Sequence, residues 1–336
     1  TLSLHDALPI LMWGLVLLCI LFVCVYGEHY DWYQSFQIRA ATVIGILILA
    51  LNLWRASFIR HPFIALKTWT YRAVWFPFIL YIVIDILLAP SHLFEHIYME
   101  SILGYDALNV ISLNWAVLLG IVVGAGFTFF TFSRRKWRYK TMTVIAFSSI
   151  TGYLMYFYFG IDYALPKETL FVPLFLRSFG YVIIAICFLT VQSRVPFQHF
   201  FQAVSVQSFV SAGFGGALGT AILGHALNGA MKKNSMLLSS VVDHVNPFIS
   251  RIPVGEVYGA VQQQALMVSM KELYGWLTLM ALFCLLAFLV YESDIRPYKV
   301  LHPTYRSIRR FVKHELRMDK NRKLQYKLRF FCSCIG

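Results

Sequence analysis

Long apolar runs, separated by short polar or basic segments, dominate this sequence. Most of them approach the roughly 20 residues that a helix needs to cross the hydrocarbon core of a bilayer. The pattern therefore predicts an all-α membrane protein with eight transmembrane helices. Their expected positions are 11–26, 40–58, 73–93, 107–132, 141–159, 170–191, 200–226 and 273–291.

The segment 133–140, Ser-Arg-Arg-Lys-Trp-Arg-Tyr-Lys, orients these spans because it is strongly basic and contains no acidic residue. Lys and Arg in short loops resist translocation, so this loop is expected on the cytoplasmic side. Eight spans then leave both ends of the chain there. The stretch 228–272 is then predicted to be a long polar outer loop, which can be partly helical. The basic tail 292–336 becomes cytoplasmic, and within it 305–312 is typical either of an amphipathic segment on anionic lipid or of a solvated helix.

Composition supports a membrane protein and argues against two other classes. Hydrophobic residues make up 59% of the chain and charged residues only 13%, with a mean hydropathy of +0.65, which excludes a soluble domain. The net charge of +13 could indicate nucleic-acid binding, but most Lys and Arg fall in segments expected inside. The excess is better explained by topology and by attraction to anionic lipid, so we expect a lipid bilayer and no nucleic acid as partner. The six cysteines lie in expected spans or in the tail, which predicts neither a disulfide nor a metal site.

Residues 1–10, Thr-Leu-Ser-Leu-His-Asp-Ala-Leu-Pro-Ile, lack the basic start and small-residue cleavage site of a signal peptide. They resemble one reading frame of a sequencing adapter. We therefore expect native sequence to begin near Leu11, with an upstream part missing, and exclude these residues from functional reasoning.

Two charged residues fall inside the expected spans. Asp85 is the one acidic residue there and lies near the middle of its span. A charge at the bilayer centre costs about 2.5–3.5 kcal/mol on insertion scales, so Asp85 should face a cavity or a partner, or stay protonated. Arg177 lies seven residues from the outer end of its span, which is about 10 Å at 1.5 Å per residue.

Each of these charges has a functional and a structural interpretation. Asp85 is a candidate for proton or substrate coupling, or it only holds helices together. Arg177 either snorkels to the outer surface, or it faces the same cavity as Asp85, where it pairs with Asp85 or binds an anionic substrate group.

Other polar and small residues in the spans are weaker candidates. Asn109, Asn114 and Gln207 are candidates for lining a cavity, although a membrane amide more often joins helices. No phosphate loop, zinc-spaced cluster or serine elbow is present, so we expect no cofactor. A small-residue face in the seventh span is expected to let two helices pack closely, and it contains Gly213, Gly215, Gly216 and Gly219.

Several short segments, taken in order, resemble one transporter family. They are Gly-Glu-His-Tyr-Asp-Trp-Tyr-Gln-Ser at 27–35, Arg-His-Pro-Phe-Ile-Ala-Leu-Lys at 60–67, Leu-Arg-Ser-Phe-Gly at 176–180, Gly-Gly-Ala-Leu-Gly-Thr at 215–220 and Val-Asn-Pro-Phe at 245–248. Their order and spacing resemble the C-terminal portion of the 14-span, EmrB- and QacA-like drug:proton antiporters of the major facilitator superfamily.

This resemblance implies a linker helix pair over 11–58 and a six-helix C-terminal domain over 59–291. Asp85 and Arg177 would then lie on the first and fourth helices of that domain, which line the central cavity in this superfamily. Two positions depart from the family pattern. Ser178 replaces a glycine, and Ala212 stands where an arginine is frequent.

The function implied is that of an N-terminally truncated exporter in the bacterial inner membrane, working by proton antiport and alternating access on small amphipathic compounds. A periplasmic adaptor and an outer-membrane channel are implied as partners. The alternatives are a transporter of an endogenous solute or lipid, a membrane-embedded enzyme that uses Asp85, and a non-transporting scaffold organised by the tail.

Overall fold

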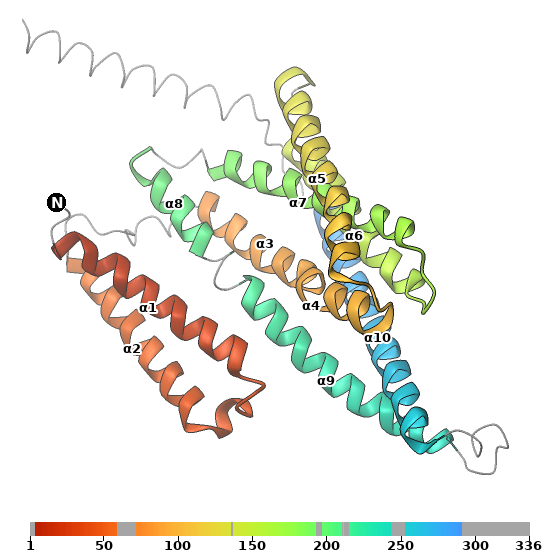
Figure 1. Cartoon of the computed structure of the whole chain (residues 1–336). Helices are drawn as coiled ribbons and strands as arrows, with labels where there is room; N and C mark the ends of the chain where they lie inside the picture. Colours follow the sequence, from red (N-terminus) through yellow and green to blue (C-terminus); the bar gives the residue numbers. More distant parts are fainter. Residues whose placement is uncertain are drawn as a thin grey trace, which may run out of the picture.

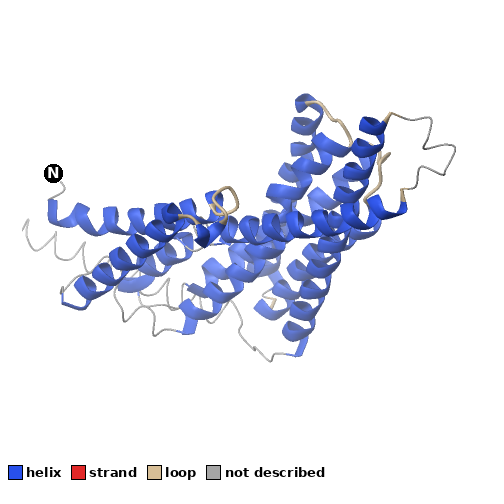
Figure 2. Ribbon diagram, turned by 90° about the horizontal axis from the view of Figure 1, so that it is seen from below, coloured by secondary structure: helices blue, strands red, loops and turns tan. Residues whose placement is uncertain are grey.

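The computed structural model describes residues 4–58, 72–135, 137–192, 197–209, 211, 215–242 and 253–290. All regular structure in these ranges is helical (Figure 2). Six helical segments within them are long and apolar enough to cross a bilayer, which identifies a multi-pass membrane protein. The count of eight spans stays a prediction. The six segments are Phe36–Phe58, Phe78–Ile102, Ala107–Phe130, Tyr139–Gly160, Lys167–Thr190 and Gly255–Val290.

A helical hairpin forms the N-terminal part of the described chain. Helix α1 (Leu4–Tyr26) contains a shorter apolar stretch, Ile10–Tyr26, and packs along α2 (Phe36–Phe58). The short 3₁₀ helix η1 (Trp32–Gln34) lies in the loop between them. Figure 1 shows this hairpin at one side of the molecule, where α1 contacts α9 (Gly216–Val241).

The next expected span is longer than the sequence pattern indicated. It consists of α3 (Arg72–Leu88), α4 (Pro90–Ile97) and the π-helical turn η3 (Tyr98–Ile102). Pro90 cannot donate a backbone hydrogen bond, but the neighbouring carbonyls still find donors. The amide of Ala89 donates to the Ile86 carbonyl at 3.3 Å, and the Ser91 hydroxyl donates to the Leu88 carbonyl at 2.6 Å.

The prediction that this span ends near residue 93 was therefore wrong, because the helix ends nine residues later, at Ile102. Pro90 and the polar residues after it suggested an exit into water. The helix instead continues to Ile102, because Pro90 occupies a first-turn position and Phe94 and Tyr98 provide a buried apolar face. Glu95, expected in an outer segment, lies within this membrane-length segment.

Three further helices pack closely through glycine. They are α5 (Ala107–Phe130), α6 (Tyr139–Gly160) and α7 (Phe171–Gln192), with η4 (Thr131–Arg135) and η5 (Lys167–Leu170) between them. A Cβ on Gly120 would lie 2.7 Å from the Phe175 carbonyl oxygen, and one on Gly180 would lie 2.8 Å from the Ala146 carbonyl oxygen. Glycine at these positions lets α5 and α6 approach the α7 backbone.

The expected seventh span contains two α-helical stretches. Helix α8 (Phe197–Phe209) ends before α9 begins, and the residues described between them, Ser211 and Gly215, are π-helical. Glycine has low helix propensity, and several glycines are clustered at this junction.

The polar stretch 228–272 is mostly helical rather than a long loop. Helix α9 continues to Val241 and α10 (Val254–Val290) has 37 residues, so only residues 242–253 lie between these helices. The two pair in this region through a buried hydrogen bond of 2.9 Å from Asn234 Nδ2 to Ser269 Oγ. Pairing of two amphipathic helices buries apolar surface that a solvated loop would leave exposed.

The core of the molecule is shared by the later helices. It contains buried residues of α3 to α7, α9 and α10, and none from the hairpin among the residues described. Figure 1 shows α3, α4 and α9 between the hairpin and the group formed by α5, α6, α7 and α10. This arrangement brings the two membrane carboxylates, Asp85 and Glu95, against different sets of helices.

Candidate functional site

Asp85 lies on α3 opposite the junction of α8 and α9. A Cβ on Gly215 would overlap the Asp85 carboxyl group, which shows how closely the two meet. Asp85 Oδ2 is buried and has no hydrogen-bond partner. A buried polar atom without a partner costs about 1–3 kcal/mol, so this position is expensive for stability alone.

Polar side chains from three segments surround Asp85. Tyr81 lies one turn earlier on α3, and Tyr181 lies on α7; both interact electrostatically with the Asp85 carboxyl group. Tyr81 also lies next to Gln207 of α8, and Tyr181 lies next to Ser211. We call these five residues, together with Gly215, the Asp85 cluster: Tyr81, Asp85, Tyr181, Gln207, Ser211 and Gly215.

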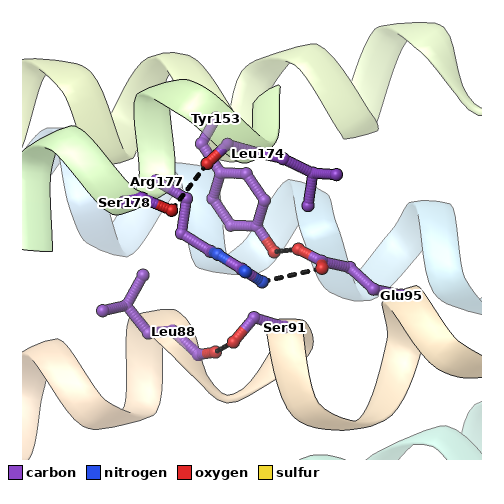
Figure 3. A network of polar contacts seen from close by, with 7 residues as sticks. All are labelled: Leu88, Ser91, Glu95, Tyr153, Leu174, Arg177 and Ser178. Atoms are coloured by element: carbon purple, nitrogen blue, oxygen red, sulfur yellow. Dashed lines mark hydrogen bonds and ion pairs between the residues drawn. The ribbon is translucent and has the colours of Figure 1, made fainter. Parts of the chain in front are cut away.

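A second buried carboxylate lies ten residues further along the same span, on α4. Arg177 Nη1 of α7 donates to Glu95 Oε2 at 2.7 Å, and Tyr153 Oη of α6 donates to Glu95 Oε1 at 2.7 Å (Figure 3). The Glu95 side chain is 7% exposed and that of Arg177 is 17% exposed. Both oxygens of Glu95 are therefore satisfied, and one carboxylate joins three helices. We call these residues the Glu95 network.

The structure thus gives Arg177 a different partner from the one expected. Arg177 pairs with Glu95 and not with Asp85. The matching depths explain the choice: Glu95 lies seven residues before Ile102, where its helix ends, and Arg177 lies seven residues after Leu170. Tyr98 ties η3 to the loop between α6 and η5, because its hydroxyl donates to the Asp162 carbonyl at 2.6 Å.

No family model matches this chain, and neither does any curated protein. The resemblance to drug:proton antiporters therefore stays a proposal, and the two carboxylate sites carry the functional argument.

Of the three amides expected to line a cavity, only Gln207 lies in the Asp85 cluster. Its Oε1 is buried without a hydrogen-bond partner. Asn109 is exposed and accepts a 3.0 Å hydrogen bond from Lys167 Nζ, while Asn114 is exposed on the surface of α5 beside Trp115. These two amides are therefore not brought to either carboxylate.

The four glycines expected to pack have different surroundings. Gly215 contacts Asp85, and a Cβ on Gly219 would lie 2.9 Å from Ala89 Cβ and 3.1 Å from the Asp85 carbonyl oxygen. Gly216 has more space, since the nearest atom to its Cβ position is the Ser211 carbonyl oxygen at 3.9 Å. Gly213 lies outside the described residues. The close approach of α9 to α3 thus occurs at 215 and 219.

The sequence reasoning missed Glu95 and Tyr153. Tyr153 is one of several tyrosines in an apolar span, and the sequence alone does not show which of them lies opposite a charged residue. Glu95 carried a usable signal, because it is followed three residues later by Tyr98 on the same helical face, which favours continuation of a half-buried helix.

A third polar group lies at the loop end of the hairpin. Glu28 Oε2 accepts hydrogen bonds from His225 Nδ1 of α9 and from Trp32 Nε1, each at 2.9 Å, and Glu28 Oε1 accepts one from Asn228 Nδ2 at 3.1 Å. These bonds, led by the one from His225, lower the pKa of Glu28 to about 2. We call this group the Glu28 latch, since it fastens the hairpin to α9.

The latch depends on an unusual backbone. Asp31 and Trp32 both have positive φ, at 50° and 54°, in the left-handed region that residues with a Cβ rarely adopt. The Trp32 ring covers Gly27, where a Cβ would lie 2.7 Å from it, and it meets the His225 ring edge-on at 5.9 Å. Such backbone strain costs about 1–3 kcal/mol per residue and persists only where surrounding contacts fix it.

Of these groups, the Asp85 cluster is the best suited to chemistry. Among the described residues no group of three or more His, Cys, Asp or Glu could hold a metal ion. What the cluster offers is a carboxylate with an unpartnered oxygen, two phenols and an amide beside the π-helical junction of α8 and α9. These groups can bind a proton or a polar part of a ligand within the membrane.

Proposed function

We propose that this chain is the C-terminal part of a proton-coupled membrane transporter, and that Asp85 is its proton-binding residue. The observation that carries this proposal is the buried Asp85 oxygen that has no hydrogen-bond partner. Ionisable residues within membrane spans are expensive and are therefore usually functional. A carboxylate that only held helices together would be paired, as Glu95 is.

The position of Asp85 supports a role in a conformational cycle. It faces the junction of α8 and α9, where Gly215 meets its carboxyl group and where Ser211 and Gly215 are π-helical. Single π-helical turns within α-helices occur frequently at functional sites. Loss or gain of charge on Asp85 would change the free energy of close contact between α3 and this junction.

The helix contacts give further support to a major facilitator C-domain. If α3 to η3 is the first helix of that domain and α8 to α9 the fifth, then the first packs on the fifth, the second on the fourth and the third on the sixth. In a domain built from two inverted three-helix repeats, the first, second and third helices correspond to the fourth, fifth and sixth. The contact of the first helix with the fifth is then equivalent to that of the second with the fourth, and the contact of the third with the sixth is equivalent to itself. The contacts of α6 with α7 and of α9 with α10 are more extensive than the contacts that the repeat symmetry makes equivalent to them, so the symmetry is partial.

By the family resemblance, the transported compounds are small and amphipathic, and the direction is export from the bacterial cytoplasm across the inner membrane by proton antiport. The Glu95 network would then hold α4, α6 and α7 together as one body while α8 and α9 move. A periplasmic adaptor and an outer-membrane channel would receive the exported compound.

The test is dye efflux from bacterial cells that lack their own exporters and express this chain within its complete reading frame. We expect Asp85→Asn to reduce efflux to background and to remove its dependence on the proton gradient. Asp106→Asn is the matched control, because Asp106 is exposed and its side chain makes no cap hydrogen bond.

A second measurement on the purified chain does not depend on transport. A carboxyl C=O infrared band should titrate with pH in the wild-type chain and be missing in Asp85→Asn. Efflux and pH profile that are unchanged in Asp85→Asn would remove Asp85 from the mechanism.

A further inference from the structure

An apolar groove of about 700 Å³ runs along the hairpin, between α1 and α2. Its volume is within the range of about 300–1,000 Å³ that is common for small-molecule sites. Residues from α1, including Leu18, Cys19 and Phe22, form one wall, and residues from α2, including Ala40, Ala41 and Ile44, form the other.

The groove exists because the two helices differ in side-chain size along their contact. Deeper along the hairpin the helices touch, since a Cβ on Gly45 would lie only 3.0 Å from Cys19 Cβ. Nearer the loop, Ala40 and Ala41 on α2 face the larger Phe22 and Val25 on α1. The two alanines leave space that a larger side chain would fill.

The groove opens onto an exposed apolar surface of the hairpin. Large apolar side chains around it are well exposed in the protein alone: Leu18 is 61% exposed, Val25 63% and Phe36 78%. The α2 segment is apolar and long enough to cross the bilayer. Within a membrane, the medium in contact with these side chains is hydrocarbon.

The length and ends of the groove fit one leaflet. From Leu15 to Val25 on α1 the lining spans ten residues, or about 15 Å at 1.5 Å per residue. This is about half of the roughly 30 Å hydrocarbon core. At the loop end the lining includes Tyr26 and Gln37, and tyrosine is enriched at the interface between lipid and water.

We infer that this groove binds one acyl chain of a phospholipid from the leaflet that contains the α1–α2 loop, with the headgroup beside Tyr26 and Gln37. The lipid fills the space above Ala40 and Ala41 and becomes part of the hairpin. This inference is independent of transport, because it rests on the shape and chemistry of the hairpin alone.

The first experiment measures phospholipid that stays with the chain after purification in detergent, by mass spectrometry and phosphate analysis. Ala41→Phe fills the groove, and Ala50→Phe is the matched control on an exposed part of α2 outside it. In Ala41→Phe the added ring should displace about two methylene groups of the acyl chain from the groove, which should lower lipid retention about tenfold. Ala50→Phe should retain as much as the wild type.

A second experiment uses the native cysteines. Cys19 lines the groove, whereas Cys24, on the same helix and also partly buried, does not. Removing lipid should speed the reaction of Cys19 with N-ethylmaleimide relative to Cys24, and adding back phospholipid vesicles should restore protection. In Ala41→Phe the Cys19 rate should be slow with or without lipid.

Equal lipid retention in Ala41→Phe and Ala50→Phe would overturn the inference. So would a rate of Cys19 reaction with N-ethylmaleimide that does not depend on lipid in the wild-type chain. Protection of Cys19 by an amphipathic dye but not by phospholipid would also overturn it, and would assign the groove to a transported compound instead.

Discussion

Asp85 and Glu95 lie on one membrane segment, ten residues apart, yet their surroundings differ in kind. Glu95 accepts one hydrogen bond at each oxygen, from Arg177 and from Tyr153, and joins α4, α6 and α7. Asp85 has a buried oxygen without any partner and faces the π-helical junction of α8 and α9. The first arrangement is typical of a structural contact and the second of a site that is completed by something else, such as a proton or a ligand.

This difference also shows that burial alone does not identify a functional charge. Glu95 is the more deeply buried of the two, and its partners account for both oxygens. The functional signal at Asp85 is the missing partner. We therefore expect removal of the Glu95 charge to reduce mainly stability, and removal of the Asp85 charge to reduce mainly function.

The largest effect on stability is expected from breaking the Glu95 network. Glu95→Gln leaves Arg177 without its anionic partner, and removal of one member of a buried ion pair costs about 3–5 kcal/mol. Asp85→Asn, the matched change at the unpaired site, should leave the free energy of unfolding unchanged or raise it. Denaturation of both variants in detergent micelles measures the contrast, and equal losses would contradict it.

A smaller effect is expected at the helix junction. Gly215→Ala places a methyl group against the Asp85 carboxyl and should cost about 1–3 kcal/mol through overpacking. Gly216→Ala has room and should be neutral or stabilising by about 0.5–1 kcal/mol, because alanine is the better helix former. Thermal unfolding of the two variants side by side provides the measurement. Similar melting temperatures would show that α3 and the junction are not in close contact.

Removing only the phenol of the Glu95 network should have an intermediate effect. Tyr153→Phe deletes the hydrogen bond to Glu95 Oε1 and should cost about 1–3 kcal/mol, because that oxygen is left buried without a partner. Tyr158→Phe is the control on the same helix, where the ring contacts Gly275 and is partly exposed. A double-mutant cycle of Tyr153→Phe with Glu95→Gln should show strong coupling; additivity would argue against a shared network.

The smallest effect is expected at the Glu28 latch, which is exposed to solvent. Glu28→Gln should cost about 1 kcal/mol at pH 7. The pKa of Glu28 is lowered in the folded chain to about 2, so the stabilisation is complete above pH 4.5 and is lost as pH falls towards 2. The gap in unfolding free energy between wild type and Glu28→Gln should therefore close over that range. A gap that persists at pH 2 would show that the carboxylate charge is not what the latch uses.

The sequence predicted the membrane class and most helix positions, and it singled out Asp85 as a candidate, because long apolar runs and an acid within one of them are local features. It did not predict the partner of Arg177, since that depends on where a neighbouring helix ends. Pro90 and the polar residues after it suggested an end too early, and this placed Glu95 outside the membrane. The π-helical junction between α8 and α9 was not predicted, because the same glycines are compatible with close packing of a regular α-helix.

The unpaired state of Asp85 could not have been predicted either. It follows from which residues of α7, α8 and α9 reach α3, and those contacts join segments more than 90 residues apart in the sequence. Likewise, Asn109 and Asn114 were plausible from their positions in a span, but the orientation of α5 leaves both exposed.

The length of α10 has a consequence for the shape of the protein outside the bilayer. With 37 residues it is a rod of about 55 Å at 1.5 Å per residue, whereas the hydrocarbon core is about 30 Å thick. Lys140 Nζ donates to the carbonyl oxygen of Leu289 at 2.7 Å, which ties that end of the rod to the basic loop at the membrane surface. The remaining length, about 25 Å, must then stand clear of the opposite surface beside the end of α9. If the orientation predicted from the basic loop is right, a bulky soluble tag joined within residues 242–253 should be accessible from outside intact cells.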